Sequence, residues 1–154
     1  MVTLTIDNWE IQAEEGISVL QAALDCEIYI PHLCWLREMT DPPASCRLCL
    51  VEISGRNRPA TACTTPVEEG MEVFTDTETV RELQRTALKL LLSVHDVDCG
   101  NCPANRQCEL QDLAKFLKVK LKPKDIPVVK PAREIDHTHP LIAYNPNRCV
   151  LCGR

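Results

Sequence analysis

Ten cysteines are unevenly spread along this 154-residue chain, and most of them fall into two groups of possible metal ligands. The first group, called set one, contains Cys34, Cys46, Cys49 and Cys63. The second group, called set two, contains His95, Cys99, Cys102 and Cys108. Each set includes a C-x-x-C pair, whose two thiolates can reach one metal centre, and each supplies the four ligands that a [2Fe–2S] or [4Fe–4S] cluster needs. Iron–sulfur clusters at these sites would make the chain an electron carrier.

Zinc is the alternative metal for both sets. Four-thiolate zinc sites usually pair two C-x-x-C knuckles, whereas set one has the spacing C-x11-C-x2-C-x13-C and only one knuckle. Set two has the spacing H-x3-C-x2-C-x5-C, and three thiolates with one imidazole are a common zinc combination. A lone histidine at a helix end can also be a simple cap. Spacing alone favours a cluster at set one and leaves cluster and zinc open at set two.

The composition limits the compartment and the partners. Met1 leads directly into VTLTI, with no basic segment and no long apolar stretch of the kind found in a secretory signal. No run approaches the roughly 18 apolar residues of a membrane span, so no direct membrane insertion is expected. We therefore expect a cytoplasmic protein, or one peripheral to a membrane complex, whose clustered thiols bind metal rather than form disulfides. The net charge of −5 argues against nucleic acid as a partner.

Residues 1–76 predict a β-rich first domain. Apolar and polar residues alternate in the first strand, Asp7-Asn8 predicts a hairpin turn, and Ser18 is placed to cap a short helix. The strands are expected over residues 2–6, 9–13, 50–54, 59–62 and 71–75. This order favours a β-grasp-like mixed fold. The long loop over 33–49 holds three of the four cysteines of set one. Loops of this length are uncommon in compact domains unless they have a function, so the loop is consistent with a bound group.

Residues 77–135 predict a helical second domain. Two capping-box patterns, Thr75-x-x-Glu78 and Thr79-x-x-Glu82, precede apolar residues at helical spacing, and the helix should end at His95. A shorter amphipathic helix is expected over 110–117, directly after Cys108. Prolines at 123, 127, 131 and 140 then break the tail, which we expect to be extended and docked on a neighbour.

The sequences around the two sets resemble a known family. They are IPHLC ending at Cys34, SCRLCLVEI over 45–53, ATAC ending at Cys63, and HDVDCGNC with QCELQDL over 95–113. They resemble the iron–sulfur region shared by the large peripheral-arm subunit of respiratory complex I, the diaphorase small subunit of NAD-linked nickel–iron hydrogenases, iron-only hydrogenases and NAD-dependent formate dehydrogenases. The resemblance implies an α+β fold. A β-grasp ferredoxin-like domain would bind a [2Fe–2S] cluster at set one. A small helical domain would bind a [4Fe–4S] cluster through one histidine and three cysteines at set two.

The resemblance continues into the last residues, 136–154, which look like the start of a further [4Fe–4S] ferredoxin domain. Cys149 and Cys152 would be two ligands of its first C-x2-C-x2-C-x3-C-P motif. The chain stops at Arg154, one residue before the next expected cysteine. We interpret this segment as a truncated domain, and a third cluster is expected only if the chain continues.

The resemblance also implies a function. It predicts an electron-transfer subunit or fragment between a flavoprotein that oxidises NAD(P)H and a catalytic redox subunit of a hydrogenase, formate dehydrogenase or quinone-reducing assembly. The sequence has no Gly-rich dinucleotide fingerprint, P-loop or nucleophile–base pair, so the chain is not expected to be catalytic alone. One alternative is a zinc-stabilised interaction module without a redox role. Another is the first part of a catalytic subunit whose active domain lies beyond Arg154.

The other cysteine, the other histidines and a basic stretch are not expected to bind metal. Cys26 lies outside both sets and is expected to be a small buried hydrophobe. His32 is not needed as a ligand, because set one is complete, and His137 and His139 are expected to be solvated. A basic stretch is expected to be a solvated face that could dock an acidic partner. It consists of Lys115, Lys118, Lys120, Lys122, Lys124, Lys130 and Arg133.

Overall fold

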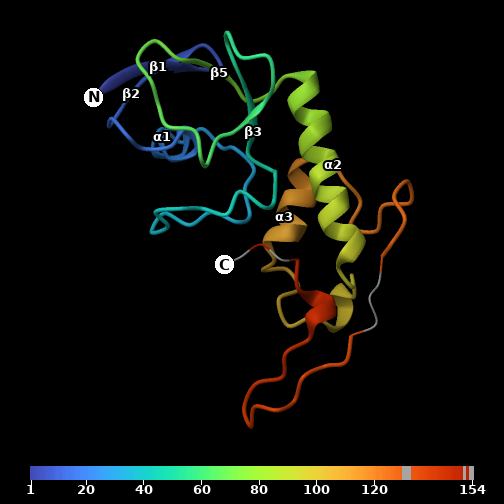
Figure 1. Cartoon of the computed structure of the whole chain (residues 1–154). Helices are drawn as coiled ribbons and strands as arrows, with labels where there is room; N and C mark the ends of the chain where they lie inside the picture. Colours follow the sequence, from blue (N-terminus) through green and yellow to red (C-terminus); the bar gives the residue numbers. More distant parts are fainter. Residues whose placement is uncertain (130–132, 151, 153–154) are drawn as a thin grey trace.

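The computed structural model describes residues 1–129, 133–150 and 152, and its first part is a mixed five-stranded sheet with one helix (Figure 1). The elements are β1 (Val2–Ile6), β2 (Trp9–Ala13), α1 (Val19–Asp25), β3 (Leu50–Ile53), β4 (Ala60–Thr61) and β5 (Glu72–Phe74). The strand order is β2-β1-β5-β3-β4, in which β1 and β5 are parallel and the other pairs are antiparallel. The predicted mixed fold of strands and helix is confirmed.

Local sequence explains the first hairpin and the helix that follows it. Asp7 and Asn8 both have positive φ, 49° and 70°, which is the backbone of the two-residue turn that matches the twist of paired strands. Ser18 caps α1 by accepting a hydrogen bond from the backbone N–H of Gln21 at 3.2 Å. Leu4 of β1 and Leu20 of α1 are fully buried in the same core. The helix therefore covers one face of the sheet.

The second part is built on two helices that lie side by side, α2 (Glu78–Val94) and α3 (Glu109–Phe116) (Figure 1). Both predicted capping boxes are wrong, because Thr77 is the N-cap of α2 and its hydroxyl accepts from the N–H of Val80 at 3.1 Å. Thr75 is engaged elsewhere, since its backbone N–H donates to Asp7 at 2.8 Å. The predicted end of α2 is correct, because His95 is its C-cap.

The two parts share a core through the set-one loop. Leu33 and Leu48 of this loop are buried in one apolar cluster with Leu88 of α2 and Leu113 of α3. Cys34 and Cys46 belong to the same cluster. The loop that carries most of set one is therefore packed between the sheet and the helices.

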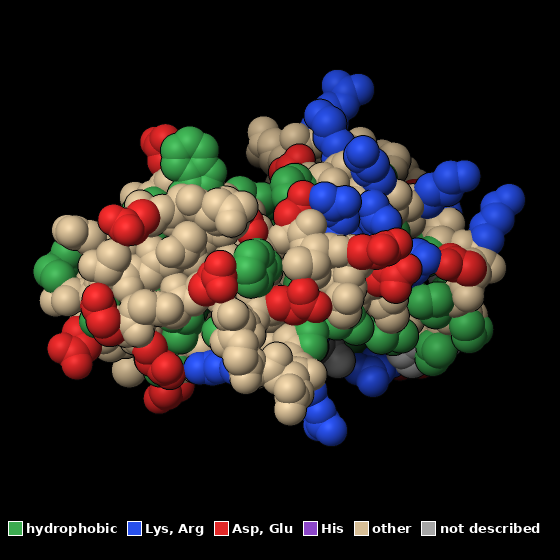
Figure 2. Space-filling model, turned by 90° about the horizontal axis from the view of Figure 1, so that it is seen from above, with side chains coloured by type: hydrophobic (Ala, Val, Ile, Leu, Met, Phe, Trp, Pro, Cys, Tyr) green, Lys and Arg blue, Asp and Glu red, His purple; other side chains and the backbone are tan. Residues whose placement is uncertain are grey.

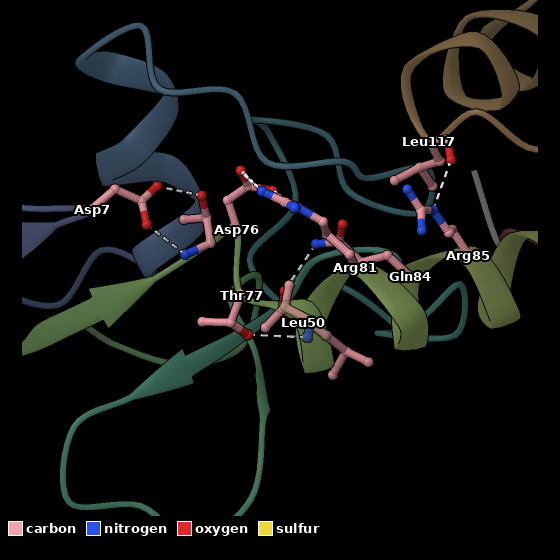
Figure 3. A network of polar contacts seen from close by, with 10 residues as sticks. Asp7, Leu50, Asp76, Thr77, Arg81, Gln84, Arg85 and Leu117 are labelled. Atoms are coloured by element: carbon pink, nitrogen blue, oxygen red, sulfur yellow. Dashed lines mark hydrogen bonds and ion pairs between the residues drawn. The ribbon is translucent and has the colours of Figure 1, made fainter.

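Two polar contacts fix α2 against its neighbours, as Figure 3 shows. The buried amide of Gln84 donates to the backbone carbonyl of Leu50 in β3 at 3.1 Å. Arg85 donates through Nε to the carbonyl of Leu117, just after α3, at 3.1 Å. Because a buried amide without a partner costs about 1–3 kcal/mol, the Gln84 contact fixes the register of α2 on the sheet.

The tail packs on α2, as expected. The N–H of Val129 donates to the carbonyl of Ser93 at 2.9 Å, and Lys89 forms an ion pair with Asp125. Lys130 and Pro131 lie outside the described residues. Further on, Asp136 pairs with Tyr144, and a 3₁₀ helix, η2 (Pro146–Arg148), precedes Cys149. Within the described ranges, no helix has the length and apolar character needed to cross a bilayer.

Candidate metal centres

Set one is a group of deeply buried thiols. Cys34, Cys46, Cys49 and Cys63 are 1%, 3%, 1% and 3% exposed. They form two pairs: Cys34 Sγ lies 3.3 Å from Cys46 Sγ, and Cys49 is hydrogen-bonded through its side chain to Cys63. A [2Fe–2S] cluster has two irons, each of which takes two cysteine thiolates, so this paired donor set fits that group.

The backbone around set one explains how these thiols come together. Ala44 and Arg47 have positive φ, 48° and 54°, a conformation that is uncommon for residues other than glycine and often occurs at functional sites. These two residues curve the loop around Cys46. At the other pair, the N–H of Ala62 donates to the carbonyl of Cys49 at 2.8 Å. This bond connects the end of the loop with the strand that precedes Cys63.

Burial and hydrogen bonding shift the pKa values of three set-one thiols, Cys46, Cys49 and Cys63. Burial raises the pKa of Cys46 to about 11, against partial compensation from backbone hydrogen bonds. The hydrogen bond to Cys63, together with burial, raises the pKa of Cys49, and the same bond lowers the pKa of Cys63. Cys49 therefore retains its proton more strongly than Cys63 does. Four thiolates in so dry a place require a cationic centre to balance their charge, which ferric iron supplies.

Set two lies along the connection between α2 and α3. His95 is the C-cap of α2, and Cys99 begins the 3₁₀ helix η1 (Cys99–Asn101). Cys102 is the C-cap of η1, and Cys108 is the N-cap of α3. The four residues are thus held at the ends of short elements, and all are partly buried. Within residues 1–129, 133–150 and 152, no three His, Cys, Asp or Glu side chains are grouped closely enough to hold a single metal ion.

The imidazole of His95 is suited to be a ligand. Burial lowers its pKa, so the ring is neutral at pH 7 and one nitrogen carries a free lone pair. Its Nδ1 is buried and has no hydrogen-bond partner. Such an orphaned buried atom is rare in native proteins and calls for a partner such as a metal. The unpaired nitrogen of His95 is therefore available as a metal ligand.

The tail cysteines lie close to both sets. The N–H of Asp96, next to His95, donates to the carbonyl of Asn147 at 2.7 Å. At the other end, the hydroxyl of Ser45, next to Cys46, donates to the carbonyl of Cys152 at 3.5 Å. Cys149 and Cys152 are both half-buried. The tail thus bridges the two sets, which sequence reasoning did not foresee.

The residues outside the sets are partly as expected. Cys26 is exposed at the C-cap of α1, so its assignment as a buried hydrophobe is wrong: the helix ends there at the surface and not against the sheet. His32 contacts the carbonyl of Ile30 through Nδ1 at 2.8 Å and is a structural residue. His137 and His139 are exposed, as expected.

Comparisons with known proteins show that the chain is similar to iron–sulfur proteins. Residues 1–78 match the family described as "2Fe-2S iron-sulfur cluster binding domain", and residues 84–122 match the "NADH-ubiquinone oxidoreductase-G iron-sulfur binding region". The whole chain is 40% identical to the NADPH-Fe(3+) oxidoreductase subunit alpha of Geobacter sulfurreducens, of which it spans 18%. It is 37% identical to the NADP-reducing hydrogenase subunit HndD of Solidesulfovibrio fructosivorans, of which it spans 27%.

A solved structure extends the similarity to three dimensions. A chain of an NAD+-reducing [NiFe]-hydrogenase in the H2-reduced state superposes with a TM-score of 0.90 and 38% identity, covering 99% of this chain and 63% of the other. At this identity the likeness goes beyond the fold alone. The chain belongs to the 2Fe-2S iron–sulfur cluster binding domain family over residues 1–78 and continues into the 4Fe–4S binding region typical of NAD(P)H-linked oxidoreductase subunits.

Proposed function

We propose that this chain binds a [2Fe–2S] cluster through the four cysteines of set one and a [4Fe–4S] cluster through His95, Cys99, Cys102 and Cys108, and that it relays electrons between them. The observation that carries the proposal is the pairing of four buried thiols at set one. The clusters supply one-electron redox chemistry. The protein supplies ligand identity, exclusion of water and the relative position of the two sites.

The shared core supports transfer between the sites. Cys34 and Cys46 of set one are buried in the apolar cluster to which Cys108 of set two is also packed. Both sites therefore border one continuous packed core, formed mainly by α2, α3 and the set-one loop. A rigid core holds the distance between two redox centres constant, since packed interiors deform little.

The partners follow from the relatives and are part of the proposal. The relatives are named as subunits of NADPH- or NADP-linked enzymes, and the solved neighbour is an NAD+-reducing hydrogenase. We assign to this chain a flavoprotein NAD(P)H-oxidoreductase partner on one side and a catalytic redox subunit on the other. The working units are a [2Fe–2S] domain over 1–76, a [4Fe–4S] domain over 77–135 and the start of a further ferredoxin domain over 136–154. The chain spans 18% and 27% of the lengths of these two relatives, and we propose that it is the electron-carrying part of a larger assembly.

Iron and sulfide analysis tests the proposal directly. Protein purified without oxygen should be brown and contain about six irons with matching acid-labile sulfide, two in one cluster and four in the other. Electron paramagnetic resonance of the reduced protein should show two distinct signals. A colourless protein with stoichiometric zinc would establish the zinc-stabilised interaction module instead.

Two serine substitutions test the ligands of set one. Cys49→Ser should remove the [2Fe–2S] signal and leave the other signal in place, because it replaces one of the paired thiols. Cys26→Ser is the matched control and should leave iron content unchanged, because Cys26 is exposed at the end of α1. Loss of a cluster in the Cys26 variant would show that the ligand assignment is wrong.

A further inference from the structure

Arg148 is held across set two by contacts at one end of its side chain. Its Nη1 donates to the backbone carbonyl of Asn101 at 3.3 Å, and its Nη2 lies 3.6 Å from a carboxylate oxygen of Asp98. Asp98 is the N-cap of η1 and Asn101 is its last residue, and the first residue of η1 is the proposed ligand Cys99. The guanidinium is therefore fixed beside the segment that carries the C-x-x-C pair. Its side chain is only 28% exposed.

The remaining donor of Arg148 has no partner. Nε is buried and makes no hydrogen bond. The planar guanidinium carries its N–H groups in a fixed fork, so the two Nη contacts also fix the direction of Nε–H. A buried N–H without an acceptor costs about 1–3 kcal/mol, and more when the group is charged. A rigidly held charged donor thus requires an acceptor.

The second orphaned atom shows where that acceptor belongs. Among the described residues, only two buried side-chain nitrogen or oxygen atoms have no hydrogen-bond partner, and these are Arg148 Nε and His95 Nδ1. The residues that carry them are neighbours, because the N–H of Asp96, next to His95, donates to the carbonyl of Asn147, next to Arg148, at 2.7 Å. Two unpaired nitrogens in one small region, one a donor and one a possible iron ligand, fit a single group that offers both sulfur acceptors and iron.

We propose that Arg148 donates a hydrogen bond through Nε–H to a sulfur atom of the set-two cluster and thereby raises the reduction potential of that cluster. This inference rests on the proposed function, which places a [4Fe–4S] cluster at set two. The electron adds one negative charge to the cluster, so a nearby cation and an N–H···S hydrogen bond both stabilise the reduced form. Arg148 is a residue that sets the potential and is not a ligand.

Three variants of the 154-residue chain separate the contribution of the Arg148 charge from that of its Nε–H donor. Arg148→Gln removes both the charge and the Nε donor. Arg148→Lys keeps the charge but has no Nε–H fork. Arg106→Gln is the matched control, because Arg106 lies between Cys102 and Cys108 but is exposed, where solvent screens its charge.

Redox titration followed by electron paramagnetic resonance measures the result. The potential of the set-two cluster should shift to more negative values in Arg148→Gln, shift in the same direction by a smaller amount in Arg148→Lys, and stay unchanged in Arg106→Gln. An equal shift in the Arg106 and Arg148 variants would overturn the proposal, because it would mean that any nearby cation acts alike. Unchanged potentials in both Arg148 variants would also overturn it.

A second measurement excludes a purely structural role for Arg148. Electron–nuclear double resonance of the reduced cluster in H2O and D2O detects exchangeable protons near the sulfurs, and one coupling present in the parent should be missing in Arg148→Lys. If Arg148→Gln loses iron, the test rests on Arg148→Lys. The inference is contradicted if this variant has its full iron content together with the potential and the proton couplings of the parent protein. A parent protein without any four-iron signal would contradict the proposed function instead, so the two failures are distinguishable.

Discussion

At the residue scale, the ligands of the two sets differ in how their environment prepares them for metal. The set-one thiols are almost fully buried, and burial holds Cys46 in its protonated form well above neutral pH. His95 is half-buried, and burial has the opposite effect on its pKa, because its charged form is the protonated one. Set one must lose protons when it binds iron, whereas His95 is ready to bind at pH 7.

The role of His95 can be tested by two substitutions. Replacing a neutral imidazole by a thiolate makes the cluster one unit more negative, so His95→Cys should keep a four-iron cluster at a lower potential. His95→Ala should make the cluster labile or cause it to lose iron. Iron analysis and redox titration with electron paramagnetic resonance would check both results. If neither variant changes the spectrum or the potential, His95 only terminates α2 and another group is the fourth ligand.

At the element scale, α2 is the element that positions both sets. Its first turn is stabilised by the Thr77 cap and by an ion pair between Asp76 and Arg81 (Figure 3). Its middle contacts β3 through Gln84, and its last residue leads into His95. Weakening the start of this helix should therefore reduce stability without removing any ligand.

A pair of threonine substitutions tests the cap. Thr77→Ala should lower the free energy of unfolding by about 1 kcal/mol, the usual cost of losing an N-cap hydroxyl. Thr79→Ala is the control, because Thr79 lies within α2 and its side chain is exposed to solvent. Its replacement should change the free energy of unfolding by less than about 0.5 kcal/mol. Urea denaturation of the cluster-loaded protein measures both values. Equal losses in the two variants would place the cap elsewhere.

At the scale of the whole molecule, positive charge is concentrated in one region although the chain carries a net charge of −5. Figure 2 shows Lys and Arg side chains gathered toward one end of the molecule. A groove of about 490 Å³ lies between α2 and the segment after α3. Its charged lining residues are Arg85, Lys89, Lys118, Lys120, Lys124 and Asp125. The basic stretch expected from the sequence therefore faces, in part, a common concavity.

The groove should bind acidic protein surfaces in a salt-dependent manner. We expect the chain to bind polyglutamate at low ionic strength and to release it as salt rises, because screening shortens the range of exposed charges to about 10 Å at 0.1 M. Lys120→Glu with Lys124→Glu should weaken binding at least about tenfold, or about 1.4 kcal/mol. Arg56→Glu with Arg58→Glu, in the turn between β3 and β4, is the control. Equal losses in both double variants would mean that only net charge matters.

The sequence by itself determined the features that depend on short-range patterns. Alternation in Val2–Ile6 predicts β1, the Asp7-Asn8 pair predicts its turn, and apolar spacing up to Val94 predicts the end of α2. Each of these follows from the period of one element or from the preference of one or two residues. The spacing of the cysteines and the flanking motifs likewise identified the iron–sulfur family, because a ligand pattern is written in the order of residues along the chain.

Only the tertiary structure decided which of several neighbouring threonines caps α2. Thr75, Thr77 and Thr79 are all possible caps, but the fold engages Thr75 with Asp7 and leaves Thr77 at the helix start. The exposure of Cys26 and the position of Arg148 across set two also depend on segments distant in sequence. No local pattern encodes such contacts, because the burial of a residue and the hydrogen-bond partners of its donors depend on segments that folding brings together from distant parts of the sequence.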